Sequence, residues 1–239
     1  HGFLTGRDPE FLHQLRVGFR RLRVALAMPE DPDWRAALEP VREEMRWLFS
    51  VLGPARNWDV FVTEILPPIQ SHFGSDEGLA ALRTRCLRLR RRHLALARKA
   101  VRSTRYPALL LSLATLLYGL PPPELPDTAE PARAFAQAII ERRDRALRKR
   151  VEGVRNATPE ERHRARIAAK KLRYSAEFFS ALYPQKKVKR FVDALSEVQE
   201  MLGTINDASV ANLLLGELGS GARADARVIG MVKGWVAAG

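Results

Sequence analysis

The chain has 239 residues, of which 46% are hydrophobic, and a formal net charge of +13 at pH 7. This length and apolar content allow one large domain or two small ones with buried cores. The positive charge favours acidic partners, namely nucleic acid, anionic lipid or another polyanion. The single cysteine, Cys86, excludes an internal disulfide framework, so we expect a reducing, cytoplasmic location. The longest apolar run, 108–118, is too short to span a bilayer, so no membrane span is expected.

The first part of the chain has the apolar spacing of helices, interrupted by proline and glycine. We expect helices over 8–28, 33–52, about 57–66 and 79–105, and an apolar helix that ends at Gly119. Gly53-Pro54 and Pro67-Pro68 are expected to end the second and third of these. The helix over 79–105 contains ten Arg or Lys residues and no Asp or Glu.

A proline-rich linker over 120–126 divides the chain near its middle. Further helices are expected over 129–154, 159–183, 186–202, 206–219 and 223–237. Thr158 is the predicted N-cap of the second of these helices, with Pro159 at its first helical position. Because no segment shows the alternating pattern of a strand, we predict an all-α protein.

Two segments of the chain repeat one motif at an offset of 150 residues. Residues 13–23 and 163–173 both fit His-x-x-Arg-(Val/Ile)-x-x-basic-basic-Leu-Arg. The segments 52–60 and 202–210 match at the same offset, so residues 8–72 correspond to 158–220 helix for helix. We therefore predict one domain made of two similar helical bundles, 1–120 and 127–239, related by a pseudo-two-fold axis.

The spacing of the motif places its charged side chains beside a core. At about 100° per residue, four of them share one helical face that borders an apolar stripe from Leu12 to Leu26. The two sets are His13, Arg16, Arg20 and Arg23, and His163, Arg166, Lys170 and Arg173. A cation beside a core either extends into solvent or lines an internal groove. The second copy favours the groove, and a solvated basic face is the alternative.

Helices 79–105 and 129–154 add further cations near their apolar stripes. Arg142, for example, lies on the same side as Phe135 and Ile139. The helical wheel selects Arg83, Arg90, His93, Arg142, Arg145 and Lys149. If these two helices and the two motif helices face one another, they form a basic channel. A linear polyanion would fill that channel, because close like charges need to be neutralised.

The doubled motif resembles the CHAD domain, the conserved histidine α-helical domain. Leu-Gly-Pro-x-Arg-Asn-x-Asp-Val follows the first copy and Leu-Gly-x-x-Asn-Asp-x-x-Val the second, so the resemblance covers nearly the whole chain. It implies two four-helix bundles around a basic central cavity that binds inorganic polyphosphate, and association with polyphosphate granules. Asn57 and Trp58 depart from the family, which more often has Asp and an aliphatic residue there; this affects packing and not the binding face.

The resemblance also implies which residues of the two motif copies face the ligand. They are His13, Arg16, Arg20, Arg21, Arg23, His163, Arg166, Lys170, Lys171 and Arg173. On the helical wheel Arg21 and Lys171 fall to the side of the shared face.

Non-catalytic polyphosphate binding is the predicted function, with no catalytic residue and no cofactor. Asp59 and Asp207 are expected in helices away from the basic face, which leaves no carboxylate cluster there to hold Mg²⁺. A metal site is disfavoured because the five histidines are far apart in the sequence and lie among cations. The alternatives are an accessory domain of a polyphosphate- or triphosphate-hydrolysing enzyme, and non-specific nucleic-acid binding. Nucleic-acid binding should be weak, because few aromatic residues adjoin the basic runs.

Overall fold

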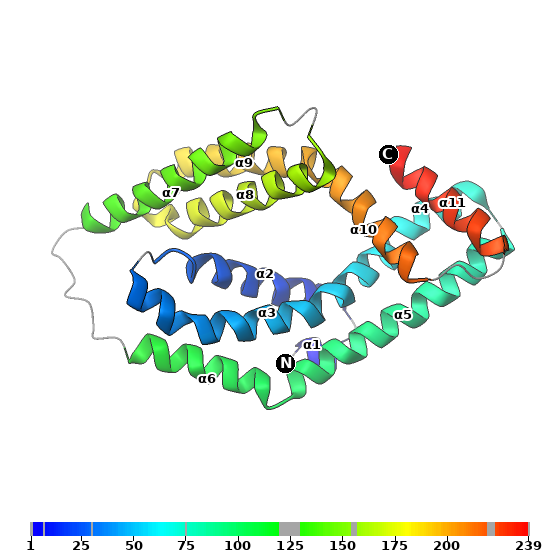
Figure 1. The fold of residues 1–239 in the computed structure, drawn as a ribbon, viewed down its shortest axis with the longest axis horizontal. Coiled ribbons are helices and arrows are strands. Elements are labelled where there is room, and N and C mark those ends of the chain that lie inside the picture. The colour runs from blue at the N-terminus through cyan, green and yellow to red at the C-terminus, as the bar shows by residue number, and fades with distance from the viewer. Residues whose placement is uncertain are drawn as a thin grey trace. The chain divides into compact units, whose positions relative to one another are not determined.

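The protein is described by a computed structural model that covers residues 2–6, 8–29, 31–74, 76–119, 130–153, 157–218 and 223–238. Every regular element in these ranges is helical (Figure 1), which confirms the predicted all-α class. The predicted linker over 120–126 lies outside the described residues. Across the described ranges, no helix combines the length and the apolar character needed to cross a membrane.

The helices mostly begin and end within a few residues of the predicted positions. They are α1 (Gly2–Thr5), α2 (Glu10–Ala25), α3 (Pro32–Val60), the π-helix η1 (Phe61–Ile65), α4 (Leu66–Phe73), α5 (Glu77–Arg102), α6 (Arg105–Tyr118), α7 (Glu130–Val151), α8 (Pro159–Phe178), the 3₁₀-helix η3 (Ser180–Leu182), α9 (Gln185–Met201), α10 (Gly203–Glu217) and α11 (Arg223–Ala238).

Two predicted helix ends are wrong, and both were placed at prolines. Helix α3 continues through Gly53-Pro54, with Leu52 before this pair and Ala55 after it fully buried. Pro54 removes one helical hydrogen bond, and the burial of this apolar side offsets that loss. Pro67-Pro68 stands in the first turn of α4, which follows the π-helix η1 directly, so the helical path continues through the two prolines.

Helix α8, which carries the second motif, begins at the predicted cap. The Thr158 hydroxyl accepts from the Glu161 amide at 3.2 Å, and the Glu161 carboxylate accepts from the Thr158 amide at 2.8 Å. These reciprocal bonds form a capping box. They also hold the pKa of the Glu161 carboxyl below its ordinary value. The start of the second motif helix is thereby fixed.

The chain forms two compact units, and each is discontinuous in sequence. The first unit contains residues 1–20, 36–118 and 207–239, and the second contains 21–35 and 119–206. Helix α11, which follows the second copy of the repeat, therefore belongs to the first unit. The predicted bundles 1–120 and 127–239 describe the sequence repeat and differ from the compact units. Their pseudo-two-fold axis and central cavity stay predictions.

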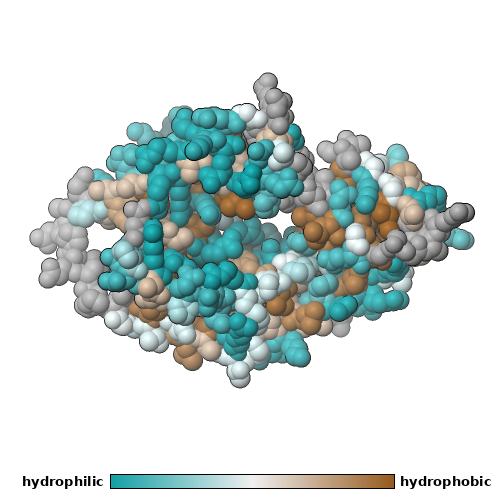
Figure 2. Space-filling model, viewed as in Figure 1, coloured by the Kyte–Doolittle hydropathy of each residue, from teal (hydrophilic) through white to brown (hydrophobic). Residues whose placement is uncertain are grey.

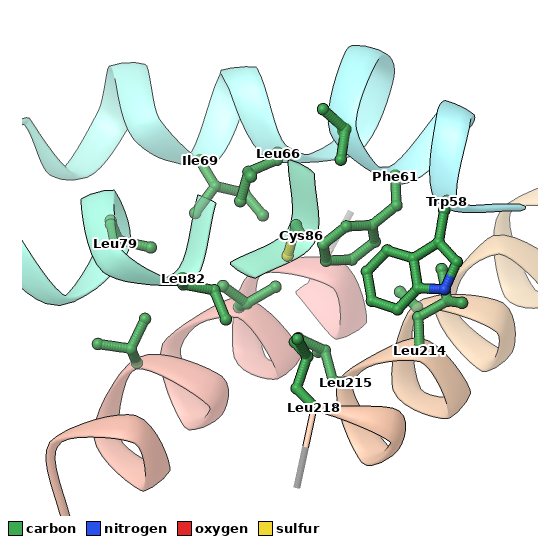
Figure 3. Close-up of a cluster of buried hydrophobic side chains, with 14 residues drawn as sticks. Trp58, Phe61, Leu66, Ile69, Leu79, Leu82, Cys86, Leu214, Leu215 and Leu218 are labelled. Carbon is green, nitrogen blue, oxygen red and sulfur yellow. The ribbon is translucent and has the colours of Figure 1, made fainter. Parts of the chain in front are cut away.

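The core of the first unit surrounds Trp58, which is fully buried. Its indole ring stands edge-on to the ring of Phe61, with the centroids 5.8 Å apart. Leucine side chains of α5 and α10, including Leu82 and Leu214, belong to the same cluster (Figure 3). Apolar side chains of this unit are visible where α10 and α11 lie (Figure 2). The departure from the family pattern at Trp58 thus fills the centre of a core.

Cys86 belongs to this core, as its apolar neighbours in the sequence predict. Burial raises the pKa of its thiol to about 12. Because the thiolate is the reactive form, this cysteine is inert at neutral pH.

The core of the second unit lies among α7, α8 and α9, which run side by side (Figure 1). One cluster joins Leu147 of α7, Leu172 of α8 and Leu195 of α9. A second cluster packs Val24, near the end of α2, against Tyr174 of α8. The second motif helix is therefore held on several sides, which fixes the direction of its charged face.

Candidate functional site

The first motif helix, α2, carries its cations beside the core. Leu12 and Phe19 are buried, whereas Arg21 and Arg23, which follow them, are exposed. The half-buried residues of this face in the first unit are His13, Arg16 and Arg20. The guanidinium of Arg16 lies over Gly53, where an added Cβ would stand 3.4 Å from Nη1. That distance is an ordinary van der Waals contact, and Gly53 lies inside α3 and does not end the helix.

The second motif helix, α8, shows the corresponding pattern in the second unit. Ala165, Ala169 and Leu172 are buried along one side. The residues beside them are only half-buried, and these are Arg166, Lys170 and Arg173, while His163 is exposed. The burial of both motif helices agrees with a basic face that borders a core. The binding role of these residues stays a prediction.

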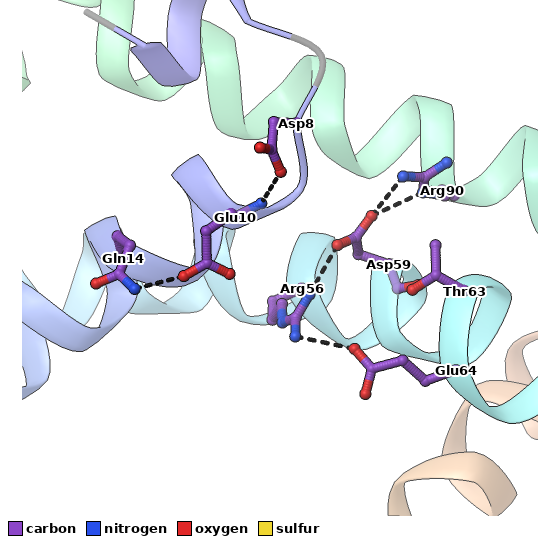
Figure 4. Close-up of polar contacts among 8 residues, drawn as sticks. All are labelled: Asp8, Glu10, Gln14, Arg56, Asp59, Thr63, Glu64 and Arg90. Carbon is purple, nitrogen blue, oxygen red and sulfur yellow. Dashed lines mark hydrogen bonds and ion pairs between the residues drawn. The ribbon is translucent and has the colours of Figure 1, made fainter.

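Arg90 of α5 is held by a buried carboxylate. Asp59 of α3 is fully buried and accepts from Arg90 Nε at 2.8 Å and from Arg56 Nη1 at 2.9 Å (Figure 4). Arg56 also donates to Glu64 at 3.1 Å. The expectation that Asp59 lies away from the basic face is wrong, since it pairs with Arg90, one of the residues predicted for that face. Arg90 joins α5 to α3, a structural role that a helical wheel does not reveal.

The other two α5 cations of the predicted site differ in their surroundings. His93 Nε2 lies 4.0 Å from the Glu217 carboxylate, which also accepts from Trp58 Nε1 at 3.2 Å. Arg83 is exposed and makes no hydrogen bond or ion pair with any residue that the structure describes. Of the three, Arg83 is therefore the most available to a ligand.

A buried arginine that sequence reasoning missed organises the second unit. Arg143 of α7 donates from Nη2 to the Val24 carbonyl at 3.2 Å and from Nη1 to the Lys171 carbonyl at 3.1 Å. Its Nη1 also donates to the Ser175 hydroxyl. All three acceptors are uncharged. Burial, assisted by the neighbouring charge of Arg142, lowers the Arg143 pKa to about 10.

The prediction placed Arg142 on the apolar side of α7, and the structure buries Arg143 there. Ile139 and Leu147 lie one turn before and one turn after Arg143, and both are buried. Phe135, which had been grouped with Arg142, keeps 46% of its surface exposed. The spacing of four residues from Ile139 to Arg143 and on to Leu147 is the signal that could have found it.

Lys171 lies in a concentration of positive charge. Burial and the nearby guanidinium groups of Arg143, Arg23 and Arg150 all lower its pKa. No carboxylate contributes to this shift. The structure thus brings Arg23 and Lys171, both predicted site residues, together with two arginines that were not predicted.

Two predicted residues of this unit share one acid. Glu177 lies 3.7 Å from Arg21 and 3.6 Å from Arg173. The Arg173 guanidinium also stands over the Tyr174 ring, 5.1 Å from its centroid. One carboxylate thus serves two cations, so this part of the basic surface keeps an excess of positive charge.

The remaining predicted cations lie on α7. Arg142 is half-buried, and Arg145 is exposed and 3.9 Å from Glu141. Lys149 is exposed and has no hydrogen bond or ion pair within the described ranges. Within those ranges, no group of three or more His, Cys, Asp or Glu side chains could hold a metal ion.

These features define an all-helical protein with two matching basic helices, a class suited to binding polyanions. The chain belongs to the CHAD domain family, which it matches over residues 1–216. The resemblance seen in the sequence is thereby confirmed. This family is linked to the binding of polyphosphate and triphosphate.

Two solved structures are similar to this chain. The CHAD domain from the plant Ricinus communis is 34% identical, with a TM-score of 0.82 over 99% of this chain and 78% of that chain. PptA from Streptomyces chartreusis is 20% identical, with a TM-score of 0.69 over 96% of this chain and 84% of that chain, and shares the fold. No curated protein matches the sequence.

Proposed function

We propose that this chain binds inorganic polyphosphate without hydrolysing it, through the basic faces of α2 and α8. The observation that carries the proposal is the grouping of Lys171 with Arg143, Arg23 and Arg150, whose charges, after burial, lower the Lys171 pKa with no carboxylate among the causes. A polymer with a negative charge on every phosphate would neutralise such a cluster. Arginine suits this ligand because its planar guanidinium offers two parallel donors to one phosphate.

The placement of the acids supports binding over hydrolysis. Phosphoryl transfer usually needs carboxylates that hold Mg²⁺ against the phosphates. Asp59 is instead enclosed between Arg56 and Arg90, and Glu177 lies between Arg21 and Arg173. Both acids are committed to cations. The proposed site therefore holds the polymer by charge and by hydrogen bonds.

Loss of one cation from each motif helix should weaken polyphosphate binding. Arg20→Gln and Lys170→Gln alter equivalent positions of the repeat, and Arg20 makes no hydrogen bond or ion pair with other described residues. We expect about a tenfold loss of affinity for each change, and about a hundredfold loss for both. Calorimetric titration with medium-length polyphosphate at two salt concentrations measures this loss, which should shrink at high salt.

The control removes two cations from a helix outside the motif. Lys186→Gln with Arg190→Gln on α9 lowers the net charge by the same amount, and both residues are exposed. Single-stranded nucleic acid of matched charge is the competing ligand. Equal affinity for the two polymers, or equal losses in the test and control variants, would reduce the proposed site to a generic basic surface. Binding by the two motif helices together predicts that affinity falls in both single variants, whereas independent binding by each helix predicts an altered stoichiometry.

The lowered pKa of Lys171 predicts proton uptake when polyphosphate binds at alkaline pH. In the free protein burial, and after it the neighbouring arginines, disfavour the protonated amine of Lys171, whereas a bound polyanion favours it, so the pKa rises on binding. Below the lowered pKa the amine is protonated in both states and no proton is taken up. Between the free and the bound pKa, binding takes up a proton.

Titrations in two buffers of different ionisation enthalpy, at neutral pH and at alkaline pH, measure this uptake. Lys171→Gln should abolish the alkaline part of it. Proton uptake that is unchanged in the variant would show that Lys171 does not face the bound polymer. The same shift has a consequence for stability: the charged amine opposes folding at neutral pH, and this cost disappears as the pH rises through the folded-state pKa.

A further inference from the structure

Helix α5 carries a second set of cations on the side opposite its core. Its buried residues are Leu79, Leu82, Cys86, Ala97 and Ala100. At 100° per residue, six cations occupy an arc of about 120° on the opposite side. These six, called the outer strip, are Arg88, Arg91, Arg92, Arg98, Lys99 and Arg102. None of them belongs to the predicted channel residues, which border the core of the same helix.

The outer strip contains no ion pair among the described residues. Arg98 donates to the carbonyls of Phe3 and Gly6, and Arg102 donates to that of Leu4. Three further members, Arg88, Arg92 and Lys99, are exposed and make no hydrogen bond with the described part of the chain. Several surface cations of other helices pair with acids one turn away, as Arg148 does with Asp144 at 2.7 Å. The strip departs from this pattern.

Uncompensated charge on one helical face has a cost. Like charges three or four residues apart, such as Arg88 and Arg92, destabilise a helix. A surface that serves only solubility interleaves the two signs of charge. The strip also borders a surface hollow of about 440 Å³, lined by Leu94, Ala95 and four of the six strip cations. The bonds from Arg98 and Arg102 to the carbonyls of Phe3 and Leu4 in α1 hold part of this wall in place.

We propose that the outer strip binds a second segment of phosphate polymer, apart from the faces of α2 and α8. From Arg88 to Arg102 the row is about 21 Å long, at 1.5 Å per residue. Helix α5 contains no Phe, Tyr or Trp on which a nucleic-acid base could stack. A thin chain with a charge on every unit fits this row better than a single-stranded nucleic acid does.

The inference rests on the proposed function, because it takes the polymer to be the same. A second attachment point changes what the protein can do with that polymer. One long chain bound at both places gains avidity, since the second contact becomes intramolecular. Two chains bound by one protein are joined. We therefore expect this protein to cross-link long polyphosphate.

The test removes strip charges that support no other part of the fold. Arg88→Gln, Arg92→Gln and Lys99→Gln are combined, and the control combines Lys186→Gln, Lys187→Gln and Arg190→Gln, three exposed residues of α9. Short polyphosphate is titrated calorimetrically, and light scattering follows mixtures with long polyphosphate. Wild type should show two classes of binding. The strip variant should lose one class of binding and scatter less light with long polymer. The slope of log affinity against log salt concentration should become shallower by about 2, which corresponds to three phosphate contacts.

The outcomes separate this inference from the proposed function. If the strip variant binds polymer and scatters light like wild type or like the control, the strip is a solvated face. A loss of affinity in the Arg20→Gln, Lys170→Gln double variant would then still support the proposed function. If that double variant keeps full affinity while the strip variant loses it, the proposed function of α2 and α8 fails and the strip is the site. Single-stranded nucleic acid of matched charge that occupies the strip equally well would overturn its assignment to phosphate polymer.

Discussion

Replacing Asp59 with alanine should lower the free energy of unfolding by about 3 kcal/mol. The fully buried carboxylate joins Arg56 of α3 to Arg90 of α5 (Figure 4). Its loss leaves two guanidinium groups close together without their shared partner. This loss of stability is at the low end of those observed when one partner of a buried ion pair is removed. The two arginine side chains keep 19% and 23% of their surface exposed, so water can partly replace the lost carboxylate. Urea unfolding followed by circular dichroism measures the change.

Two variants test the cause of that loss. Asp59→Asn keeps the size of the side chain and one oxygen acceptor, so it should lose less stability than the alanine variant. Arg90→Gln leaves Asp59 paired with Arg56 and should also lose less. An unfolding free energy of Asp59→Ala within about 0.5 kcal/mol of wild type would contradict the structural role of this triad. At temperatures where the alanine variant is folded, its affinity for polyphosphate should not fall, because the change removes a negative charge.

The helices could be predicted wherever the local pattern decides the structure. The capping box at Thr158 and the basic faces of α2 and α8 depend only on residues three or four apart in one helix. The prediction that the helix ends at Gly53-Pro54 was wrong because burial in the tertiary structure outweighed the helix-breaking tendency of these two residues. Leu52 and Ala55 continue the buried side of α3 across the proline.

The candidate site shows a different limit of sequence reasoning. Arg142 and Arg143 are adjacent and both border the apolar stripe of α7, so spacing alone leaves their roles open. The three uncharged acceptors around Arg143 come from α2 and α8, and no single-helix pattern contains them. The pair of Asp59 and Arg90 spans two helices in the same way. Charge partners that belong to different helices are set by packing.

The sequence repeat predicted which segments of the chain are similar, but it predicted less about how the helices pack. Helix α11 lies after the second copy, yet Val228 and Val232 belong to the cluster around Trp58. The apolar side of α5, including Leu79 and Leu82, must be buried against another element, and α11 contacts α5 there. Matching sequences show that two segments fold alike locally. Which helices cover which core depends on the apolar surface that each leaves open.

Replacing Trp58 with alanine should lower the free energy of unfolding by about 3 to 5 kcal/mol. The indole is fully buried, stacks edge-on with Phe61 and lies near Leu214 (Figure 3). Its Nε1 also donates to Glu217 at 3.2 Å. Truncation would leave a cavity at the centre of the first unit, and a rigid core closes only part of such a cavity. Denaturant unfolding measures the loss, and a change below about 1 kcal/mol would contradict the central position of Trp58.

Two milder variants separate the contributions of this residue. Trp58→Phe keeps an aromatic ring beside Phe61 and removes the bond to Glu217, which should cost about 1 kcal/mol beyond the smaller ring. Trp58→Leu places an aliphatic side chain at this position, as is more common in the family, and should lie between the phenylalanine and alanine variants. All three should bind polyphosphate with unchanged affinity while folded, because Trp58 lies inside a core and touches neither motif helix face. A loss of affinity in Trp58→Phe would instead show that the Glu217 bond positions His93 for the ligand.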